Sequence, residues 1–160
     1  SAWACKKCTF AQGYTSEAEI GAAQTLEAGL AIIAKRRKSA SEVESMAIIG
    51  EVRGKNVLLV DDLTETAGTL TKGAELLKKK GAKRIVACVS HAILNDTGVE
   101  RLRKSVIDEL ITTDTVLRPA IRGVKITTLS VAGLLGEAIK RIHNNSSVTS
   151  LFESKGGRTS

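Results

Sequence analysis

Two apolar runs separated by an amphipathic segment constrain the fold of this chain more than any other feature. The runs are residues 56–60 and 84–90, and each has the length and composition of a buried strand. The segment between them, residues 69–80, carries apolar side chains at helical spacing and is followed by Gly81, which commonly ends a helix. Parallel strands are joined by a crossover of this kind, so the pattern predicts a βαβ unit.

The scarcity of aromatic residues points to the same fold class. Aromatic residues make up 2% of the chain, and three of the four (Trp3, Phe10 and Tyr14) lie close to its first residue. The core must therefore consist of Val, Ile, Leu and Ala, which suits helices packed on a mainly parallel sheet. The same scarcity argues against a protein that binds nucleic acid by stacking bases on aromatic rings.

Further segments complete one α/β domain, a mainly parallel sheet flanked by helices. Residues 30–33 are interpreted as a buried strand or the end of a helix, and Asn95 is expected to cap a short helix that continues to Lys104. The strand at 56–60 is expected to end at the two aspartates that follow it. The other expected elements are an apolar run at 46–49, strands at 109–112 and 125–129, and a final helix at 131–143.

The charge and cysteine content limit the partners and the compartment. The net charge is +7, which suits nucleic acid, anionic membranes or phosphorylated metabolites. Basic clusters lie at 35–38, 78–84 and 101–104, and the second and third fall where helices are expected to end, a position that favours cations. No apolar run approaches the roughly 18 residues of a membrane span. The three cysteines are an odd number and suggest no disulfide framework. We expect a cytoplasmic protein that binds neither nucleic acid nor membranes.

Two carboxylates followed by a loop of small residues form the candidate site. The strand delivers Asp61 and Asp62 to the edge of the sheet where open α/β sheets bind ligands. Residues 66–69, Thr-Ala-Gly-Thr, then lead into the predicted helix, whose first N–H groups attract anions. Carboxylates accept hydrogen bonds from vicinal sugar hydroxyls. Acids followed by a phosphate-binding turn therefore predict a site for a pentose 5-phosphate.

This stretch resembles the PRPP-binding motif shared by type I phosphoribosyltransferases and ribose-phosphate pyrophosphokinases (PRPP synthases). Its sequence, Asp-Asp-Leu-Thr-Glu-Thr-Ala-Gly-Thr-Leu, is closer to the form of the motif in the synthases, although Glu65 stands where Asp is customary. The likeness extends from Leu30 to Phe152 and includes Ala-Ile-Ile-Ala-Lys-Arg-Arg at 31–37 and Ser-Val-Thr-Ser-Leu-Phe at 147–152. The chain thus resembles the C-terminal, phosphoribosyltransferase type I-like domain of a PRPP synthase.

The resemblance implies a reaction and a set of roles. The family transfers a pyrophosphoryl group from ATP, with Mg²⁺, to the 1-hydroxyl of ribose 5-phosphate, giving PRPP for nucleotide biosynthesis. Lys35 and Arg37 would be catalytic and stabilise the phosphates during transfer. Asp61 and Asp62 would hold the ribose hydroxyls, or Mg²⁺ directly or through water. The residues expected to wrap the 5-phosphate are Thr66, Ala67, Gly68 and Thr69.

Less specific parts of the resemblance concern regulation and assembly. Ser147, Thr149 and Phe152 resemble part of an allosteric site for nucleotide and phosphate, and the family forms homo-oligomers. Two alternatives stay open: a type I phosphoribosyltransferase that uses PRPP, and a non-catalytic regulatory homologue that assembles with active synthase. His91 and His143 are expected to be surface or capping residues without a partner constellation, and Cys88 a small core residue.

The first 29 residues differ from the family pattern. They lack the family's pyrophosphate-binding turn and its basic, Ala-rich helix. Reading the degenerate codons of the first residues one base later permits a family-like segment, which suggests that residues 1–29 are translated out of frame. Sequencing the DNA tests this hypothesis. The expected organisation is an atypical segment at 1–29, the phosphoribosyltransferase-like domain at 30–152, and a disordered tail at 153–160.

Overall fold

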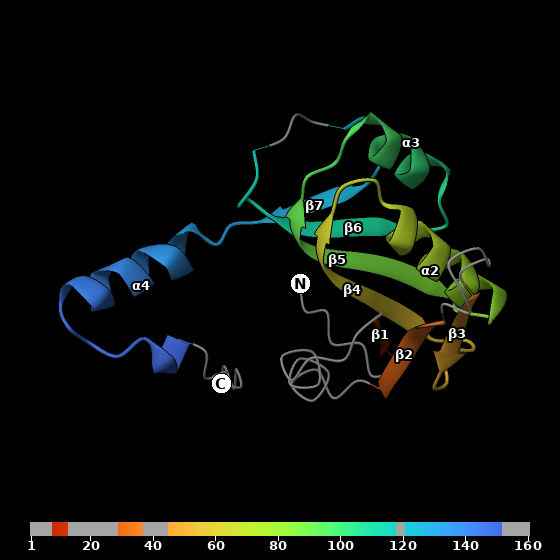
Figure 1. Ribbon diagram of the computed structural model, residues 1–160, viewed down its shortest axis with the longest axis horizontal. Coiled ribbons are helices and arrows are strands. Elements are labelled where there is room, and N and C mark those ends of the chain that lie inside the picture. Colours follow the sequence, from red (N-terminus) through yellow and green to blue (C-terminus); the bar gives the residue numbers. More distant parts are fainter. Residues whose placement is uncertain (1–7, 13–28, 37–44, 118–120, 152–160) are drawn as a thin grey trace, which may run out of the picture.

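A seven-stranded sheet organises the part of the chain that the computed structural model describes, residues 8–12, 29–36, 45–117 and 121–151. The strands lie in the order β3-β2-β1-β4-β5-β6-β7 (Figure 1). Among them only β2 and β3 pair antiparallel. The strands are β1 (Cys8–Gln12), β2 (Gly29–Arg36), β3 (Ser45–Ile49), β4 (Asn56–Thr64), β5 (Arg84–Ala92), β6 (Glu109–Thr113) and β7 (Ile126–Leu129). The predicted mainly parallel α/β fold is confirmed.

The predicted βαβ unit consists of β4, the helix α2 (Gly68–Lys79) and β5. Val57 of β4 pairs with Ile85 of β5, and both side chains are buried. The helix buries the face that carries Leu70, Ala74 and Leu77. Helical periodicity locates α2 to within one residue at each end, because its apolar face must lie on the sheet.

The sequence-based end of β4 is wrong. The aspartates were expected to end the strand after Val60, yet β4 continues to Thr64. The reason is the partner strand: the pairing of β4 with β5 continues past the aspartates to Thr64 and Ala92. A strand persists where a neighbouring strand satisfies its backbone groups, whatever its local composition. The segment 30–33, left open between strand and helix, belongs to β2.

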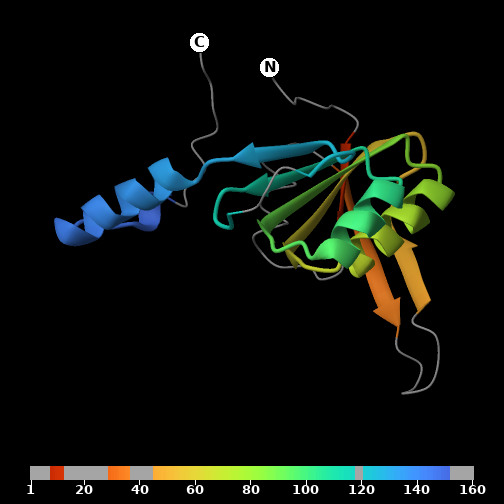
Figure 2. The ribbon, with the colours of Figure 1, turned by 90° about the horizontal axis from the view of Figure 1, so that it is seen from above.

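A second helix, α3 (Asp96–Lys104), lies beside α2 on the same face of the sheet (Figures 1 and 2). Its N-cap is Asn95, as predicted, and the Asn95 side chain accepts a hydrogen bond from the Gly98 N–H at 2.9 Å. The side chain of Leu102 is buried and anchors the helix in the core. The connection from β5 to α3 is short, so α3 begins at the edge of the sheet where β5 ends.

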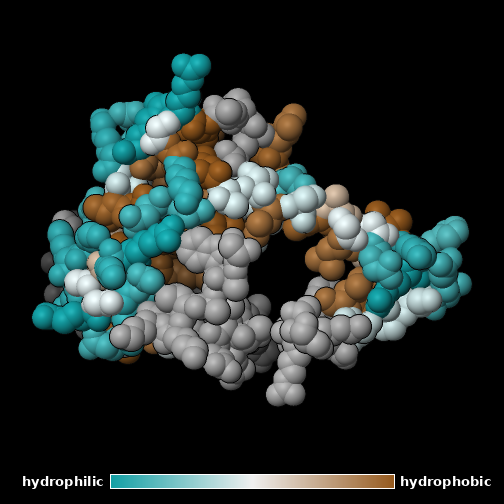
Figure 3. Space-filling model, turned by 180° about the vertical axis from the view of Figure 1, so that it is seen from behind, coloured by the Kyte–Doolittle hydropathy of each residue, from teal (hydrophilic) through white to brown (hydrophobic). Residues whose placement is uncertain are grey.

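The last helix, α4 (Ala132–His143), extends away from the sheet beyond β7 (Figure 2). Its apolar residues recur at helical spacing as predicted, but the described residues do not cover them. Leu135, Ile139 and Ile142 are each more than half exposed. Apolar atoms are visible on this part of the surface in Figure 3. None of the helices in the described residues is long and apolar enough to cross a membrane.

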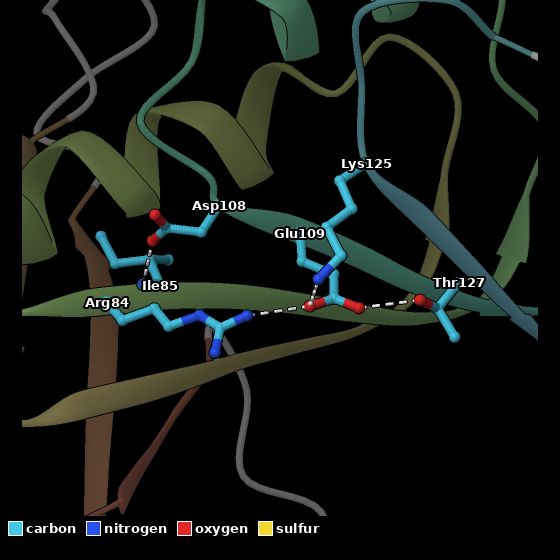
Figure 4. A network of polar contacts seen from close by, with 6 residues as sticks. All are labelled: Arg84, Ile85, Asp108, Glu109, Lys125 and Thr127. Atoms are coloured by element: carbon cyan, nitrogen blue, oxygen red, sulfur yellow. Dashed lines mark hydrogen bonds and ion pairs between the residues drawn. The ribbon is translucent and has the colours of Figure 1, made fainter.

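A buried carboxylate ties three strands together at the amino-terminal edge of the sheet (Figure 4). Glu109, the first residue of β6, is 4% exposed. Its Oε2 lies 2.9 Å from Arg84 Nη2 of β5 and 3.0 Å from Lys125 Nζ, and its Oε1 accepts a hydrogen bond from Thr127 Oγ1 of β7 at 2.7 Å. A buried charge needs partners of this kind to be tolerated.

The network sets the protonation of two groups. The hydrogen bond from Thr127, reinforced by Lys125 and Arg84, holds the pKa of Glu109 below its ordinary value of 4.5. Burial, with a smaller contribution from the negative charge of Glu109, raises the pKa of Cys88 from 9.0 to about 11. The half-buried Cys88 thiol is therefore protonated at neutral pH, which agrees with its expected role as a packing residue.

We predict that Glu109→Gln lowers the free energy of unfolding by about 2 kcal/mol at neutral pH, because it removes charge-assisted hydrogen bonds from a buried site. Since folding lowers the pKa of Glu109, its stabilising effect is present above its unfolded pKa and disappears as the pH falls through its folded pKa. Urea titrations at several pH values measure the difference between the variant and the wild type.

The control for this prediction is Glu100→Gln, which removes a carboxylate paired with Lys104 on the exposed surface of α3. We expect a much smaller change, because solvent screens exposed pairs. A difference between Glu109→Gln and the wild type that stays constant between pH 7 and pH 3 would contradict the assigned role of Glu109.

Candidate functional site

The candidate site lies where β4 ends and α2 begins. Both belong to the carboxyl-terminal edge of the parallel strands, the edge at which open α/β sheets bind ligands. Residues 65–67 connect the two elements and are called the β4–α2 loop below. Because β5 ends next to β4, the residues that follow β5 reach the same edge.

The two aspartates are the sixth and seventh of the nine residues of β4. Asp61 is half-buried and Asp62 is exposed. The Asp62 N–H donates to Asp61 Oδ1 at 3.0 Å, and the Leu63 N–H donates to Asp62 Oδ1 at 2.7 Å. Successive side chains of a strand point to opposite faces, so the two carboxylates leave β4 on different sides. They are better placed to contact two different groups than to chelate one.

The turn into α2 depends on Ala67. This residue adopts the left-handed conformation, with φ 52° and ψ 14°, and is 2% exposed. Its carbonyl accepts hydrogen bonds from the N–H of Thr71 at 2.9 Å and from Thr71 Oγ1 at 2.8 Å. The first turn of α2 contains no acidic residue, so nothing on the helix itself opposes the binding of an anion at its N-terminus.

A polar cluster at the same edge was missed in the sequence. His91 Nδ1 lies 2.7 Å from Thr115 Oγ1, which lies 2.8 Å from Thr113 Oγ1. His91 pairs in register with Leu63, one residue beyond Asp62. The expectation that no partners surround His91 is therefore wrong. The available signal in the sequence is that polar residues stand at the ends of two parallel strands, β5 and β6, which meet at one edge of the sheet.

The described structure does not test the roles of the other predicted site residues, although β2 runs parallel to β4 by way of β1 and ends at the same edge of the sheet. Lys35 belongs to β2, and Arg37 lies outside the described residues. Ser147 and Thr149 follow α4 in the chain and are exposed, and Ser147 Oγ donates to Thr149 Oγ1 at 3.2 Å. Phe152 lies outside the described residues. These assignments stay predictions.

The donor set at the sheet edge fits magnesium bound together with a substrate. Within the described residues there is no group of three or more His, Cys, Asp or Glu side chains that could hold a metal ion. Mg²⁺ commonly keeps several waters and binds through one or two carboxylates and substrate phosphates. Asp61 and Asp62 can supply such carboxylates, whereas a metal held by protein ligands alone would need more of them.

The sheet is mainly parallel, its strand β4 carries two carboxylates, and a left-handed turn leads from β4 into the N-terminus of α2. These features define a phosphoribosyltransferase type I-like domain. The family model described as phosphoribosyl synthetase-associated domain matches residues 14–153. The chain therefore belongs to the phosphoribosyl synthetase family, the PRPP synthases. The match begins inside residues 1–29, and the reading of that segment as out of frame stays a hypothesis for DNA sequencing.

Individual relatives agree with this assignment. The ribose-phosphate pyrophosphokinase of Campylobacter jejuni is 47% identical over 131 residues, which cover 81% of this chain and 42% of that protein. The enzyme of the same name from Caldanaerobacter subterraneus is 50% identical over the same shares. A crystal structure of phosphoribosylpyrophosphate synthetase from Mycobacterium smegmatis matches with a TM-score of 0.76 and 28% identity, covering 88% of this chain and 46% of that one. The chain thus spans about two fifths of the length of these curated relatives.

We predict that Ala67→Val destabilises the chain by about 2 kcal/mol or more, whereas Ala67→Gly changes the free energy of unfolding by less than about 1 kcal/mol. A β-branched side chain is strained at positive φ and has no space at this buried position, while glycine adopts the conformation freely. Denaturant titrations compare the two variants. Equal losses would show that the left-handed turn is not the constraint at this residue.

Proposed function

We propose that this chain is the ribose 5-phosphate-binding part of a ribose-phosphate pyrophosphokinase, which transfers a pyrophosphoryl group from ATP to ribose 5-phosphate. The observation that carries the proposal is the succession of two aspartates, the left-handed Ala67 and the N-terminus of α2 at one sheet edge. It occurs in a chain that is 47% to 50% identical to proteins of that name. Because the chain spans about two fifths of those proteins, the complete reaction is part of the proposal.

The phosphate would be held by the β4–α2 loop and the first turn of α2. Backbone N–H groups at the start of a helix lack intrahelical acceptors and are directed at an anion placed there. The exposed hydroxyls of Thr66 and Thr69 are further donors to phosphate oxygens. The helix dipole contributes about 0.3–1 kcal/mol, whereas each hydrogen bond to a charged group contributes about 1.5–3 kcal/mol. The hydrogen bonds of residues 66–69 therefore dominate the binding of the phosphate.

The aspartates would hold the sugar. Ionised carboxylates only accept hydrogen bonds, and the ribose hydroxyls can donate them. A neutral sugar between the aspartates and the phosphate keeps the two negative groups apart. Asp61 and Asp62 leave β4 on different sides, so each can serve a separate group, one hydroxyl or one water of a bound ion.

Magnesium and the basic residues would complete the reaction. Mg²⁺ would be held by Asp61 or Asp62, directly or through water, and would neutralise charge on the phosphates of ATP. Lys35 and Arg37 would add positive charge to the transferred group, which is the main requirement of phosphoryl transfer. The same proposal includes assembly into a homo-oligomer and a cytoplasmic location. It also includes a regulatory role for Ser147, Thr149 and Phe152. The names of the relatives favour this activity over a phosphoribosyltransferase that uses PRPP.

We predict that the 160-residue chain binds ribose 5-phosphate more tightly than ribose, and that Asp62→Asn weakens the binding of ribose 5-phosphate about tenfold through a lost charged hydrogen bond. Isothermal titration calorimetry measures both affinities. The control is Glu75→Gln, which removes an exposed carboxylate from the middle of α2 and should leave the affinity unchanged. A wild-type chain that does not distinguish the two sugars would refute the proposed phosphate site.

We further predict that the isolated 160-residue chain forms little AMP from ATP, ribose 5-phosphate and Mg²⁺. The reason is that it spans 42% of the length of the synthases it matches, so groups that bind ATP are expected in the remainder. Separation of nucleotides by anion-exchange chromatography gives the turnover. Rapid turnover by this chain alone would show that it carries a complete nucleotide site.

A further inference from the structure

Three successive carbonyl groups, at the end of β4 and in the β4–α2 loop, accept hydrogen bonds from one neighbouring segment of the chain. They belong to residues 64–66, and all three accept hydrogen bonds from residues 93–101, the segment that links β5 to α3 and forms the first part of α3. In order, the donors are the N–H of Ile93 at 2.9 Å, the N–H of Asn95 at 3.2 Å and Nη1 of Arg101 at 3.1 Å.

The direction of these carbonyls determines the direction of the next N–H groups. No peptide bond in the described residues is cis, and in a trans peptide the C=O and the following N–H point in opposite directions. Carbonyls drawn toward α3 therefore turn the N–H groups of Thr66 and Ala67 away from it, toward the open edge of the sheet. Within the described structure, no protein group accepts a hydrogen bond from either of these two N–H groups.

At Gly98 the contact between α3 and the β4–α2 loop is made by backbone atoms. Gly98, in the first turn of α3, is buried, and a Cβ atom at this position would overlap the carbonyl oxygen of Glu65. The Gly98 N–H is already used by the capping side chain of Asn95 at 2.9 Å. The start of α3 therefore lies directly against the loop backbone, with no side chain between them.

Arg101 is the one side chain of this segment that bonds a carbonyl of the loop. Its Nη1 lies 2.9 Å from the place that a Cβ on Gly68 would occupy, so the guanidinium group lies at the start of α2. A cation beside a helix N-terminus is electrostatically unfavourable in the absence of an anion. Arg103 and Lys104 pair with Glu100, but Arg101 forms no ion pair with the described carboxylates. The charge of Arg101 is thus available to the carbonyl of Thr66 that it bonds.

We propose that residues 93–101 position the β4–α2 loop for binding a phosphate monoester. Arg101 is the positioning residue: it fixes the peptide group between Thr66 and Ala67, so that the N–H of that peptide points toward the phosphate. The assignment of the phosphate rests on the proposed function, since the monoester is that of ribose 5-phosphate. Holding the donors in place before the ligand arrives removes the cost of ordering them on binding. Arg101 acts through the peptide group and does not itself contact the substrate.

The test compares Arg101→Met with Arg103→Met in the full 160-residue chain. Both variants remove one exposed arginine from the same helix, but Arg103 donates to the carbonyl of Arg122 at 3.0 Å and not to the loop. Two quantities are measured: the amide ¹⁵N and ¹H chemical shifts of residues 66–69 without ligand, and the affinities for ribose 5-phosphate and ribose. A third variant, Arg101→Lys, keeps the charge and a donor.

We expect Arg101→Met to shift the amide signals of residues 66–69 and to weaken the binding of ribose 5-phosphate about tenfold, with little change for ribose. Arg103→Met should alter neither quantity, and Arg101→Lys should restore part of the affinity. Unchanged amide signals in Arg101→Met, or an unchanged affinity for ribose 5-phosphate, would overturn the inference. If the wild-type chain shows no preference for ribose 5-phosphate, the proposed function fails. The amide signals of Arg101→Met then test the positioning of the loop by themselves: shifted signals support it, and unshifted signals exclude it.

Discussion

The parallel pairing of β4 with β5 is the constraint on which the site depends. It runs from Asn56 and Arg84 at one edge of the sheet to Thr64 and Ala92 at the other. Because the two strands end together, the loop that follows β4 and the connection that follows β5 lie side by side. The backbone hydrogen bonds from Ile93 and Asn95 to residues 64 and 65 then follow from the register of the strands. A slip by one residue would exchange the faces of β4 and move the aspartates with them.

Small residues in the loop require support from outside it. Ala67 and Gly68 offer no polar side chain that could orient their own peptide groups, and the left-handed conformation of Ala67 costs of order 1–3 kcal/mol. The bonds that offset this cost come from Thr71 on α2 and from residues 93–101. Small side chains leave room for the proposed phosphate to approach the backbone, and the surrounding helices supply the rigidity that the loop lacks. The geometry of the site is therefore a property of α2, α3 and β5 together.

Local patterns predicted the βαβ unit, the Asn95 cap and the position of the candidate loop, because each depends on residues close in sequence. The continuation of β4 past its aspartates could not be predicted, since it depends on pairing with β5. Arg101 was interpreted as a cation at a helix end, and its bond to Thr66, 35 residues away, has no signal in the sequence. The spacing in α4 predicted an apolar face correctly, but it could not show that the described residues leave that face exposed.

Charge is arranged differently at the two edges of the sheet. At the amino-terminal edge, the buried carboxylate of Glu109 is matched by Arg84 and Lys125, so the charges are balanced within the protein and stabilise the fold. At the carboxyl-terminal edge, α2 begins without an acidic residue and Arg101 has no carboxylate partner among the described residues. This excess of positive charge is confined to the start of α2, because the two aspartates of β4 belong to the same edge of the sheet. A phosphate bound as proposed, at the edge where parallel sheets bind ligands, would bring negative charge to the start of α2.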